Sequence, residues 1–392
     1  MRILMVASVP FFVDRGTPMR ILEEALALER KGCEVDIVTY HLGRKPEEIK
    51  DGSKIKIYRI ARLLFWYKKK EAGANWQKII LDLLLIWKVS KITFLKKPDI
   101  IHAHLHEGTA VAWTVKKIFF WRKIKLVADY HGELVSEMES HGYLNFPVVR
   151  KIFSFLENMI VNFGDYSVAS SKELQEKILQ IRKDGRVKIV LDGINPERYQ
   201  EKFKLDLAGT EDKLKVIYSG AFVGNKGIDI LLEAILKIKQ QNIEDILFIL
   251  AGSPVENISG FIKKNNLEKI VKIISPLDYA DLPKVNMSGD VAIDPKTSEV
   301  GQASGKILQY MGAGLPVICF DRKNNREYLQ GAGYYVKDFS ADGLVEAILY
   351  FDKNRDMINK MSEQSRARVQ NFTWDESAQK IINIYKKLKT NE

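Results

Sequence analysis

A polar loop that contains glycine stands between a predicted strand and a predicted helix in the second half of the chain. Residues 291–294 read VAID, which predicts a buried strand, and residues 307–314 read ILQYMGAG, which has helical spacing and ends at Gly314. A second buried strand, PVICF, follows at 316–320. In such a unit the N–H groups at the helix start lack partners within the helix and suit an anion such as a diphosphate. A Rossmann-like crossover that binds no ligand is the alternative.

Lys226 and Gly227 occupy a second loop of this kind. Residues 214–234 read LKVIYSGAFVGNKGIDILLEA, which predicts a strand ending near Ser219 and Gly220, a loop, and then an amphipathic helix. A lysine beside glycines at a strand-to-helix turn offers a point charge and open backbone to a diphosphate. The loop is not a P-loop, because Ser or Thr does not follow the Gly and Lys at the required spacing.

Histidines follow two predicted strands of the first half. The run PDIIHAH ends in His102 and His104, and His131 follows the apolar run IKLVADY. Since open parallel sheets bind ligands at the carboxyl ends of their strands, these side chains are site candidates. We expect His102 and His104 to point to opposite sides of their strand, so that they do not chelate a metal together with His106, and no metal site is predicted. A structural role for each histidine is the alternative; His131, which precedes Gly132, is the one favoured for function.

The elements that must position these residues repeat one pattern. A strand at 1–8, a loop, a helix at about 20–30 and a strand at 31–40 form the doubly wound unit. The first loop holds Gly16 but no GxGxxG, and the second strand is followed by His41 rather than by an acidic ribose ligand. These features argue against a dinucleotide-dependent oxidoreductase.

The length of 392 residues exceeds one ordinary core, so two domains are expected. The turn DGINPERY at 192–199 and the polar run at 201–213 read as the linker between them. Hydrophobic residues make up 46% and charged residues 28%, which is typical of a globular chain rather than a disordered one. The two cysteines, Cys33 and Cys319, provide no disulfide framework and suit a reducing cytosol.

The positive charge is concentrated in the first half of the chain. Residues 1–200 hold 34 Lys and Arg against 24 Asp and Glu, and residues 201–392 hold 27 against 26, which together give the net charge of +11. Residues 54–97 alone hold 12 basic and 2 acidic residues. A field of this kind indicates an anionic partner for the first half.

Aromatic and basic residues are mixed in two segments, 62–97 and 113–125. Amphipathic helices of this composition lie at a bilayer interface, with rings at headgroup depth and lysines on anionic lipid. Aromatics in the core beneath a solvated lysine face are the alternative, and nucleic acid is disfavoured because no reader motif is present. No run reaches the ~18 apolar residues of a spanning helix, and the N-terminal MRILMVASVPFF lacks the cleavage site and long apolar core of a signal peptide.

Five motifs, in order over nearly the whole chain, resemble those of glycosyltransferase family 4. They are the opening strand and glycine loop with ILEEALALERKGCEVDIVTYH, then PDIIHAH, DYHG, YSGAFVGNKGIDILLEA and KILQYMGAGLPVI. The resemblance implies the α/β GT-B architecture, with two facing Rossmann-like doubly wound parallel-sheet domains and a cleft between them. It implies an acceptor-binding domain over 1–195, completed by a C-terminal helix at 374–392, and a donor-binding domain over 196–373.

The resemblance also implies a hexosyltransferase-type reaction that moves a sugar from a nucleotide-sugar with retention and requires no metal or cofactor. Lys226 would neutralise the diphosphate as it leaves, which is stabilisation where charge develops, and His131 would contact the donor sugar near the reacting carbon. Gly16 would let the first loop approach the diphosphate and the acceptor. On the acceptor side the resemblance implies Arg20 and His104. The residues implied at the donor are Gly16, Gly220, Lys226, Glu299, Gly301, Gln302, Ser304, Lys306 and Gln309.

The sequence departs from the family pattern at three positions. Ala221 stands where the family often has an arginine, and Gly301 and Gln309 stand where it has two glutamates. The Gln309 amide still donates and accepts hydrogen bonds and so suits a ribose hydroxyl. A shift of the loop would let Glu299 take the place of Gly301, and Lys306, which fits one branch of the family, would supply the charge that Ala221 lacks.

The function expected is a retaining glycosyltransferase of cell-envelope glycan biosynthesis. It would be cytoplasmic and peripheral on the inner face of the cell membrane, held there through residues 62–97 and 113–125. Its other partners would be a nucleotide-sugar donor and a lipid-linked or surface-glycan acceptor, and no nucleic acid is expected. The alternatives are a nucleotide-sugar epimerase or a glycan phosphorylase of the same fold, and a non-catalytic partner protein whose donor loop has lost its activity.

Overall fold

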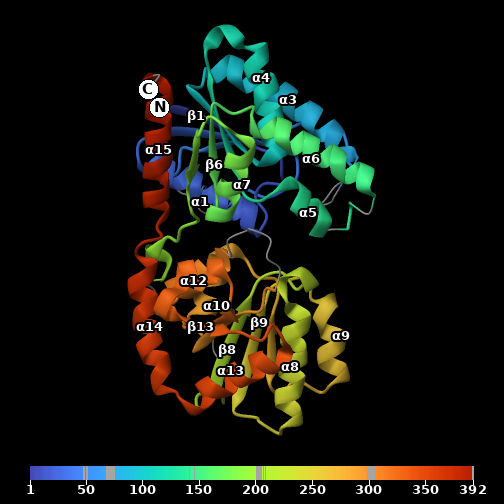
Figure 1. The fold of residues 1–392 in the computed structure, drawn as a ribbon, viewed down its shortest axis with the longest axis vertical. Coiled ribbons are helices and arrows are strands. Elements are labelled where there is room, and N and C mark those ends of the chain that lie inside the picture. The colour runs from blue at the N-terminus through green and yellow to red at the C-terminus, as the bar shows by residue number, and fades with distance from the viewer. Residues whose placement is uncertain are drawn as a thin grey trace. The chain divides into compact units, whose positions relative to one another are not determined.

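The chain forms two compact units in a computed structural model (Figure 1). Unit 1 comprises residues 1–192 and 374–390, and unit 2 comprises residues 193–297 and 305–373. Among the described residues, the chain passes from unit 1 to unit 2 after residue 192 and returns to unit 1 at residue 374 with its last helix. The structure describes all residues except 47–48, 50–51, 68–75, 141, 145, 200–204, 206, 208, 298–304 and 391–392.

Unit 1 is built on a seven-stranded sheet whose order is β3-β2-β1-β4-β5-β6-β7. Every neighbouring pair is parallel. This is the doubly wound order, in which the direction of winding reverses between β1 and β4. The strands are β1 Arg2–Ala7, β2 Glu34–Thr39, β3 Lys56–Arg59, β4 Ile100–His104, β5 Lys125–Tyr130, β6 Tyr166–Ala169 and β7 Val187–Ile189.

Helices cover the sheet of unit 1 because each has one apolar stripe to bury. On one face, α3 packs against α4, and their buried residues form one core with β1 and β4. The last helix, α15, packs against α1, so the two ends of the chain meet in the same unit (Figure 1). The helices are α1 Gly16–Arg30, α3 Gln77–Lys96, α4 Leu105–Ile118, α5 Leu134–Ser140, α6 Pro147–Val161, α7 Lys172–Ile181 and α15 Trp374–Thr390.

Unit 2 repeats the plan with six parallel strands in the order β10-β9-β8-β11-β12-β13. Winding reverses here between β8 and β11. The strands are short and almost wholly apolar, as expected where both faces of a parallel sheet are covered. They are β8 Leu214–Ser219, β9 Ile246–Ala251, β10 Val271–Ile274, β11 Val291–Asp294, β12 Val317–Phe320 and β13 Gly333–Val336.

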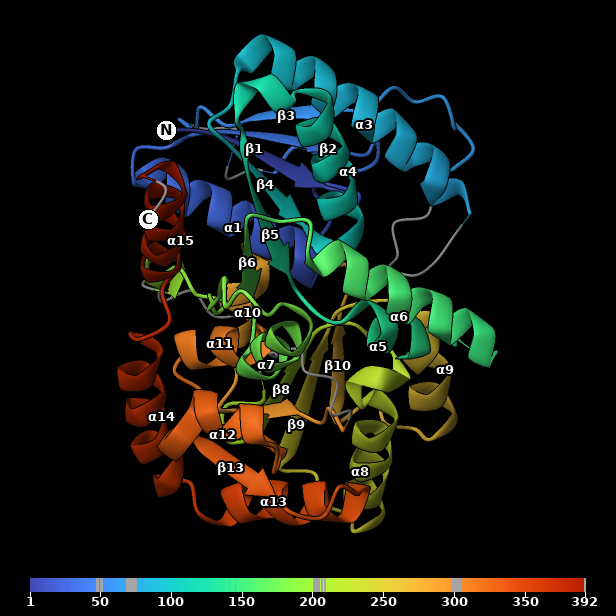
Figure 2. The same cartoon turned by 45° about the horizontal axis from the view of Figure 1, so that its top comes forward.

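The helices of unit 2 form two groups. Helices α8 and α13 pack together and bury their apolar stripes in one core with β8, β9 and β11 (Figure 2). A second group joins α11 to α10, α12 and α14. The helices are α8 Ile228–Gln240, α9 Glu256–Lys264, α10 Leu282–Asn286, α11 Gly305–Gly312, α12 Lys323–Leu329, α13 Ala341–Lys353 and α14 Asp356–Val369.

The first helix begins earlier than predicted, at Gly16 rather than near Arg20. Pro18 explains the difference: it lies within the first turn, where a helix needs no N–H from it and where its fixed φ suits helix initiation. Gly16 is therefore the first residue of a helix and not part of the loop. A Cβ added at Gly16 would meet no atom within 4 Å, so the structure shows no close approach there that requires glycine.

Candidate functional site

The candidate residues of unit 2 lie where its strand order reverses. Gly220 directly follows β8, and Asp294 ends the neighbouring strand β11. Open α/β sheets bind ligands in the crevice outside the carboxyl ends of the strands at such a point. The side chains that converge here therefore define the candidate site of this unit.

Lys306 reaches this edge from α11. Its Nζ lies 3.4 Å from Asp294 Oδ1 and 4.2 Å from the centre of the Tyr218 ring. Burial lowers its pKa, but Tyr218 and Asp294 outweigh burial and raise the pKa above its ordinary value, so the ammonium keeps its proton. Neither this Nζ nor the two oxygens of Asp294 has a hydrogen-bond partner among the described residues. An ammonium carries three donors, so Lys306 is able to hold an anion.

Two further cations lie at the same edge, and sequence reasoning did not single out either. Lys296 follows β11 by two residues and is 4% exposed, and Arg322 follows β12 and is 7% exposed. Burial, then the charges of Lys226 and Arg322, lowers the pKa of Lys296 to about 7, although Asp294 acts in the opposite direction. We call Lys226, Lys296, Lys306 and Arg322 the cation cluster. Among the four described charged residues that act most strongly on Lys296, Asp294 is an acid and the other three are basic.

Glycine allows the loops of the cation cluster to touch. Gly227 has φ +79°, and a Cβ there would lie 1.9 Å from the carbonyl oxygen of Pro295. The loop that carries Lys226 therefore rests directly on the loop that carries Lys296. At Gly220, φ is +147° and a Cβ would lie 3.4 Å from Lys306 Nζ. The absence of side chains at both glycines lets the loops of Lys226 and Lys296 touch, and leaves room for Lys306 of α11 beside the end of β8.

Gln309 lies one helical turn after Lys306 and is half-buried. Its side-chain oxygen accepts a hydrogen bond from the Tyr199 hydroxyl, which leaves the amide N–H groups for a ligand. Four other predicted donor residues lie outside the described residues. They are Glu299, Gly301, Gln302 and Ser304.

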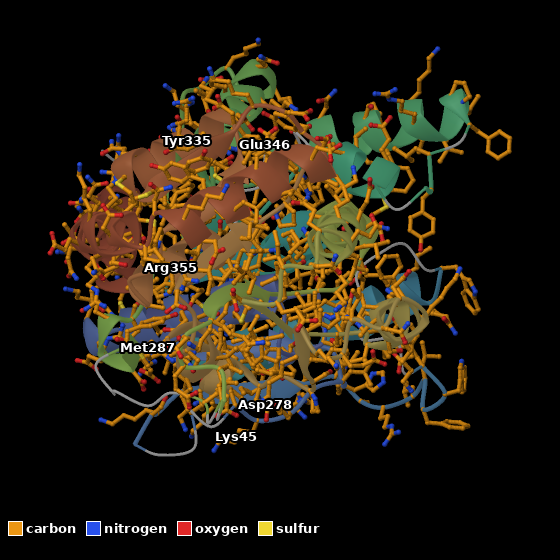
Figure 3. The ribbon with its side chains drawn as sticks, turned by 90° about the horizontal axis from the view of Figure 1, so that it is seen from below. Lys45, Asp278, Met287, Tyr335, Glu346 and Arg355 are labelled. Atoms are coloured by element: carbon orange, nitrogen blue, oxygen red, sulfur yellow. The ribbon has the colours of Figure 1, made fainter. Side chains whose placement is uncertain are left out.

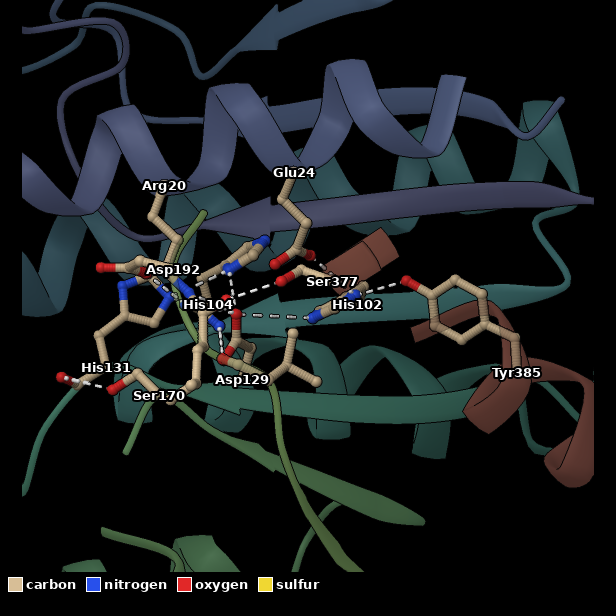
Figure 4. Close-up of polar contacts among 12 residues, drawn as sticks. Arg20, Glu24, His102, His104, Asp129, His131, Ser170, Asp192, Ser377 and Tyr385 are labelled. Atoms are coloured by element: carbon tan, nitrogen blue, oxygen red, sulfur yellow. Dashed lines mark hydrogen bonds and ion pairs between the residues drawn. The ribbon is translucent and has the colours of Figure 1, made fainter. Parts of the chain in front are cut away.

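In unit 1, Arg20 of α1 is 4% exposed and is held by two acids. Its Nε and Nη2 each lie 3.2 Å from an oxygen of Asp129, Nη2 donates to the Val190 carbonyl at 3.1 Å, and Nη1 donates to Asp192 (Figure 4). The guanidinium is thus committed within the unit. We assign Arg20 to positioning Asp129 rather than to contact with an acceptor.

Asp129, at the end of β5, also holds two of the predicted histidines. Its Oδ2 lies 3.3 Å from His131 Nε2 and 3.4 Å from His104 Nδ1. Burial would raise the pKa of Asp129, but Arg20 and His131 keep it well below its ordinary value, so the acid stays ionised. His104 is fully buried, and burial lowers its pKa to about 4 despite Asp129. His131, at the rim of this cluster, keeps 9% of its side chain exposed.

His102 and His104 lie on the same side of β4, contrary to our expectation. Their rings stack with centroids 4.8 Å apart and planes 11° apart (Figure 4). The reason is the two-residue period of a strand: successive side chains alternate, so side chains two apart share a face. His102 Nδ1 forms a hydrogen bond with the hydroxyl of Tyr385, which arrives from α15, and lies 3.5 Å from Glu24 Oε1.

Four of the side chains in this region are of the types that ligate metal ions and lie close together. Glu24, His102, His104 and Asp129 each place one ligand atom within 4.8 Å of the others. Burial and Asp129 raise the pKa of Glu24 well above its ordinary value. Since Arg20 already donates to both oxygens of Asp129 and supplies the balancing charge, we interpret the group as a buried polar core that positions His131.

Comparison with known proteins follows the division of the chain. The sequence profile described as Glycosyltransferase Family 4 matches residues 15–198, and that described as Glycosyl transferases group 1 matches residues 199–368. The chain belongs to glycosyltransferase family 4. It is a glycosyltransferase with the GT-B fold, as the motifs predicted.

Relatives of this glycosyltransferase are distant but similar in length. An uncharacterised glycosyltransferase of Methanocaldococcus jannaschii is 22% identical over 98% of both chains. The chitobiosyldiphosphodolichol beta-mannosyltransferase of Debaryomyces hansenii is 23% identical, over 79% of this chain and 71% of its own.

Among solved structures, sucrose-phosphate synthase of Thermosynechococcus elongatus matches with a TM-score of 0.81 and 18% identity over 100% of both chains. The Anabaena protein HepE in complex with UDP and glucose matches with a TM-score of 0.74 and 17% identity over 98% of both chains. At these identities the likeness shows the GT-B fold alone.

Proposed function

We propose that this glycosyltransferase moves a sugar, with retention, from a nucleotide-sugar to a lipid-linked or surface-glycan acceptor at the cytosolic membrane face. The observation that carries the donor part is the cation cluster at the carboxyl ends of β8, β11 and β12. Three lysines and one arginine, from the loops at these strand ends and from α11, suit the two charges of a nucleotide diphosphate. The UDP bound to the Anabaena relative in fold is consistent with such a donor.

The cation cluster also suggests how transfer is assisted. When the bond between the sugar and the diphosphate breaks, negative charge develops on the diphosphate, and fixed cations stabilise it most where water is excluded. We assign this role to Lys226 and Lys306. Because the cluster supplies the charge itself, we propose a reaction that needs no metal or cofactor. His131, held by Asp129, is assigned to the transferred sugar.

A surface of unit 1 supports the membrane part of the proposal. The aromatics of the two basic segments are mostly exposed, against the alternative that they are core; Tyr67, Trp113 and Phe119 are the three that pack inward. Helix α6 adds an apolar stripe that sequence reasoning did not identify, and aromatic rings stand out from the green helical ribbon in Figure 3. We call these residues the apolar surface: Trp76, Ile79, Leu83, Trp87, Phe94, Leu95, Ile118, Phe120, Trp121, Phe146, Val148, Ile152, Phe155 and Met159.

Positive charge accompanies the apolar surface. A cavity of about 370 Å³ beside Phe120 is lined by basic side chains and by Asp165, which pairs with Lys116. Rings that enter the headgroup region, with cations on anionic lipid, are the arrangement of a peripheral membrane protein. No helix in the described parts of the chain has the length and apolarity needed to cross a bilayer. The basic residues of the cavity are Lys116, Lys117, Lys123, Arg182 and Arg186.

A nucleotide-sugar screen tests the donor assignment. The wild-type protein is heated with each of a panel of nucleotide-sugars, and a bound donor at 100 times its dissociation constant stabilises by about 2.7 kcal/mol. Donors that stabilise are then incubated with lipid-linked acceptors, and the anomeric configuration of the product is read by NMR. An inverted product contradicts retention, and stabilisation by no nucleotide-sugar overturns the donor assignment in favour of a non-catalytic protein.

Incubation without an acceptor separates glycosyl transfer from epimerisation and phosphorolysis. An epimerase converts the nucleotide-sugar when no acceptor is present, and a phosphorylase turns over only when free phosphate is added. A glycosyltransferase requires the acceptor and releases the nucleotide in equal amount to the glycoside formed.

A further inference from the structure

Lys296 is a buried lysine surrounded by other basic side chains. It lies at the reversal point of unit 2, two residues beyond the end of β11, and is 4% exposed. The charged groups that act on it are Lys226 from the loop before α8, Arg322 from the loop after β12, Lys306 from α11 and Asp294 from β11. A buried lysine is ordinarily paired with an acid, and Asp294 is the only acid of this set.

A bound anion would compensate the positive charge around Lys296. Residues 220–225, the loop after β8 that leads to Lys226, carry no charge. Apart from Lys226 itself, the positive charge for a diphosphate therefore comes from the neighbouring strand ends and from α11. The contact between Gly227 and Pro295 places the loop of Lys296 directly beside that of Lys226. Two phosphate groups match the charge of such a cluster better than Asp294 alone does.

We propose that Lys296 binds the diphosphate of the donor and takes up one proton from solvent as it does so, which makes donor affinity fall as the pH rises above neutrality. The inference rests on the proposed nucleotide-sugar donor. In the free protein, burial and the neighbouring cations favour the neutral amine of Lys296. When the anion binds, the amine gains a proton to become an ammonium, and the new ion pair with phosphate holds that proton. No other bond is made or broken.

The proton is measured directly by titration calorimetry. UDP, GDP and ADP are titrated in turn into the wild-type protein at pH 8 in two buffers of different ionisation enthalpy. The terminal phosphate has a second pKa of about 6, so at pH 8 it is already ionised and the proton gained belongs to the protein. We expect uptake of close to one proton per site, and a dissociation constant that rises about tenfold for each pH unit between pH 8 and 9.

Three variants decide the assignment. Lys296→Met should weaken binding by about tenfold or more and abolish proton uptake. Lys296→Arg, whose guanidinium never loses its proton, should bind well, take up no proton and lose the pH dependence. Lys269→Met removes the same charge from an exposed residue before β10, at the opposite edge of the sheet, and should behave as wild type. Thermal unfolding of each variant confirms that it is folded.

The two failures are distinguishable. If the wild-type protein binds one of the nucleotides without proton uptake, or if Lys296→Met binds it and takes up a proton as wild type does, the inference about Lys296 is wrong and the donor assignment stands. If none of the three nucleotides binds the wild-type protein, the donor assignment falls and the inference falls with it.

Discussion

His131 Nε2 lies 3.3 Å from Oδ2 of Asp129, so a buried acid orients the one histidine of the cluster that keeps contact with solvent. The same carboxylate accepts hydrogen bonds from Nε and Nη2 of Arg20. Asp129→Asn should therefore leave a buried cation poorly compensated, and the free energy of unfolding should fall by about 3–5 kcal/mol. Urea denaturation measures the change. Asp375→Asn, which breaks an exposed pair with Arg30, is the control and should cost under about 1 kcal/mol; equal losses would contradict the buried-pair argument.

His131→Ala tests the role of that histidine in transfer. If its imidazole contacts the sugar as the bond breaks, turnover should fall by about 100-fold, while the thermal midpoint changes little because the side chain is at the rim of its cluster. Steady-state kinetics with donor and acceptor measures both kcat and KM. His41→Ala, in the same unit and also partly exposed, should retain wild-type turnover. Wild-type kcat in His131→Ala would remove this residue from the site.

Lys226→Ala tests stabilisation of the leaving group. Loss of one cation at the departing diphosphate should lower kcat by about 100-fold or more. The exposed Lys269→Ala is the matched control, and its kcat should equal that of the wild-type protein. An unchanged kcat in Lys226→Ala would show that the diphosphate leaves elsewhere.

The buried histidines predict acid sensitivity of the fold. Burial lowers the pKa of His104 to about 4, and burial with His104 lowers that of His102 well below its ordinary value. The unfolded chain, with a histidine pKa of about 6.5, binds more protons in this interval, so stability should fall as the pH drops from 6.5 toward 4. Urea midpoints taken every half unit measure the slope.

Glu24 acts in the opposite direction, because its raised pKa makes the folded state bind the proton more tightly. The comparison with His104→Gln isolates the histidine, since Glu24 is present in both proteins. The variant should show a shallower fall between pH 6.5 and 4. Parallel slopes in the two proteins would mean that His104 titrates normally.

The apolar surface predicts membrane binding that salt weakens. Wild-type protein should sediment with anionic liposomes at low salt and detach as the salt concentration rises, because added ions screen the lysines. Ile152→Ser with Phe155→Ser on α6 should reduce the partition coefficient at least tenfold, since each apolar side chain that leaves the headgroup region forfeits about 1.5–3 kcal/mol. Phe339→Ser, at an exposed aromatic position in unit 2, is the control. If the wild-type protein does not bind the liposomes at low salt, the membrane assignment is wrong.

Much of the fold follows from local sequence, and so does part of the site. Apolar runs of four to six residues that stop at a turn residue, glycine or proline, marked these strands, which is why Gly220 and Asp294 were found at strand ends. Lys226 was visible because its glycines are adjacent in sequence. The start of α1 was misplaced because Pro18 was read with the loop rather than as part of a first helical turn.

What the sequence did not reveal depends on distant segments. Lys296 and Arg322 look like ordinary lysine and arginine until sheet pairing brings their loops together. The local sequence around Tyr385 does not predict its hydrogen bond with His102, which lies 283 positions earlier. The stripe on α6 has a helical period, but its residues read equally well as core, and only their exposure distinguishes the two.

The return of α15 to unit 1 sets an order on biosynthesis. The ribosome makes Trp374–Thr390 only after every residue of unit 2 has been made. Unit 2 is therefore free to fold on the emerging chain while unit 1 still lacks its final helix, and Tyr385 is not yet there to meet His102. Unit 1, whose first strand is made before any residue of unit 2, is therefore complete only after unit 2 has been synthesised.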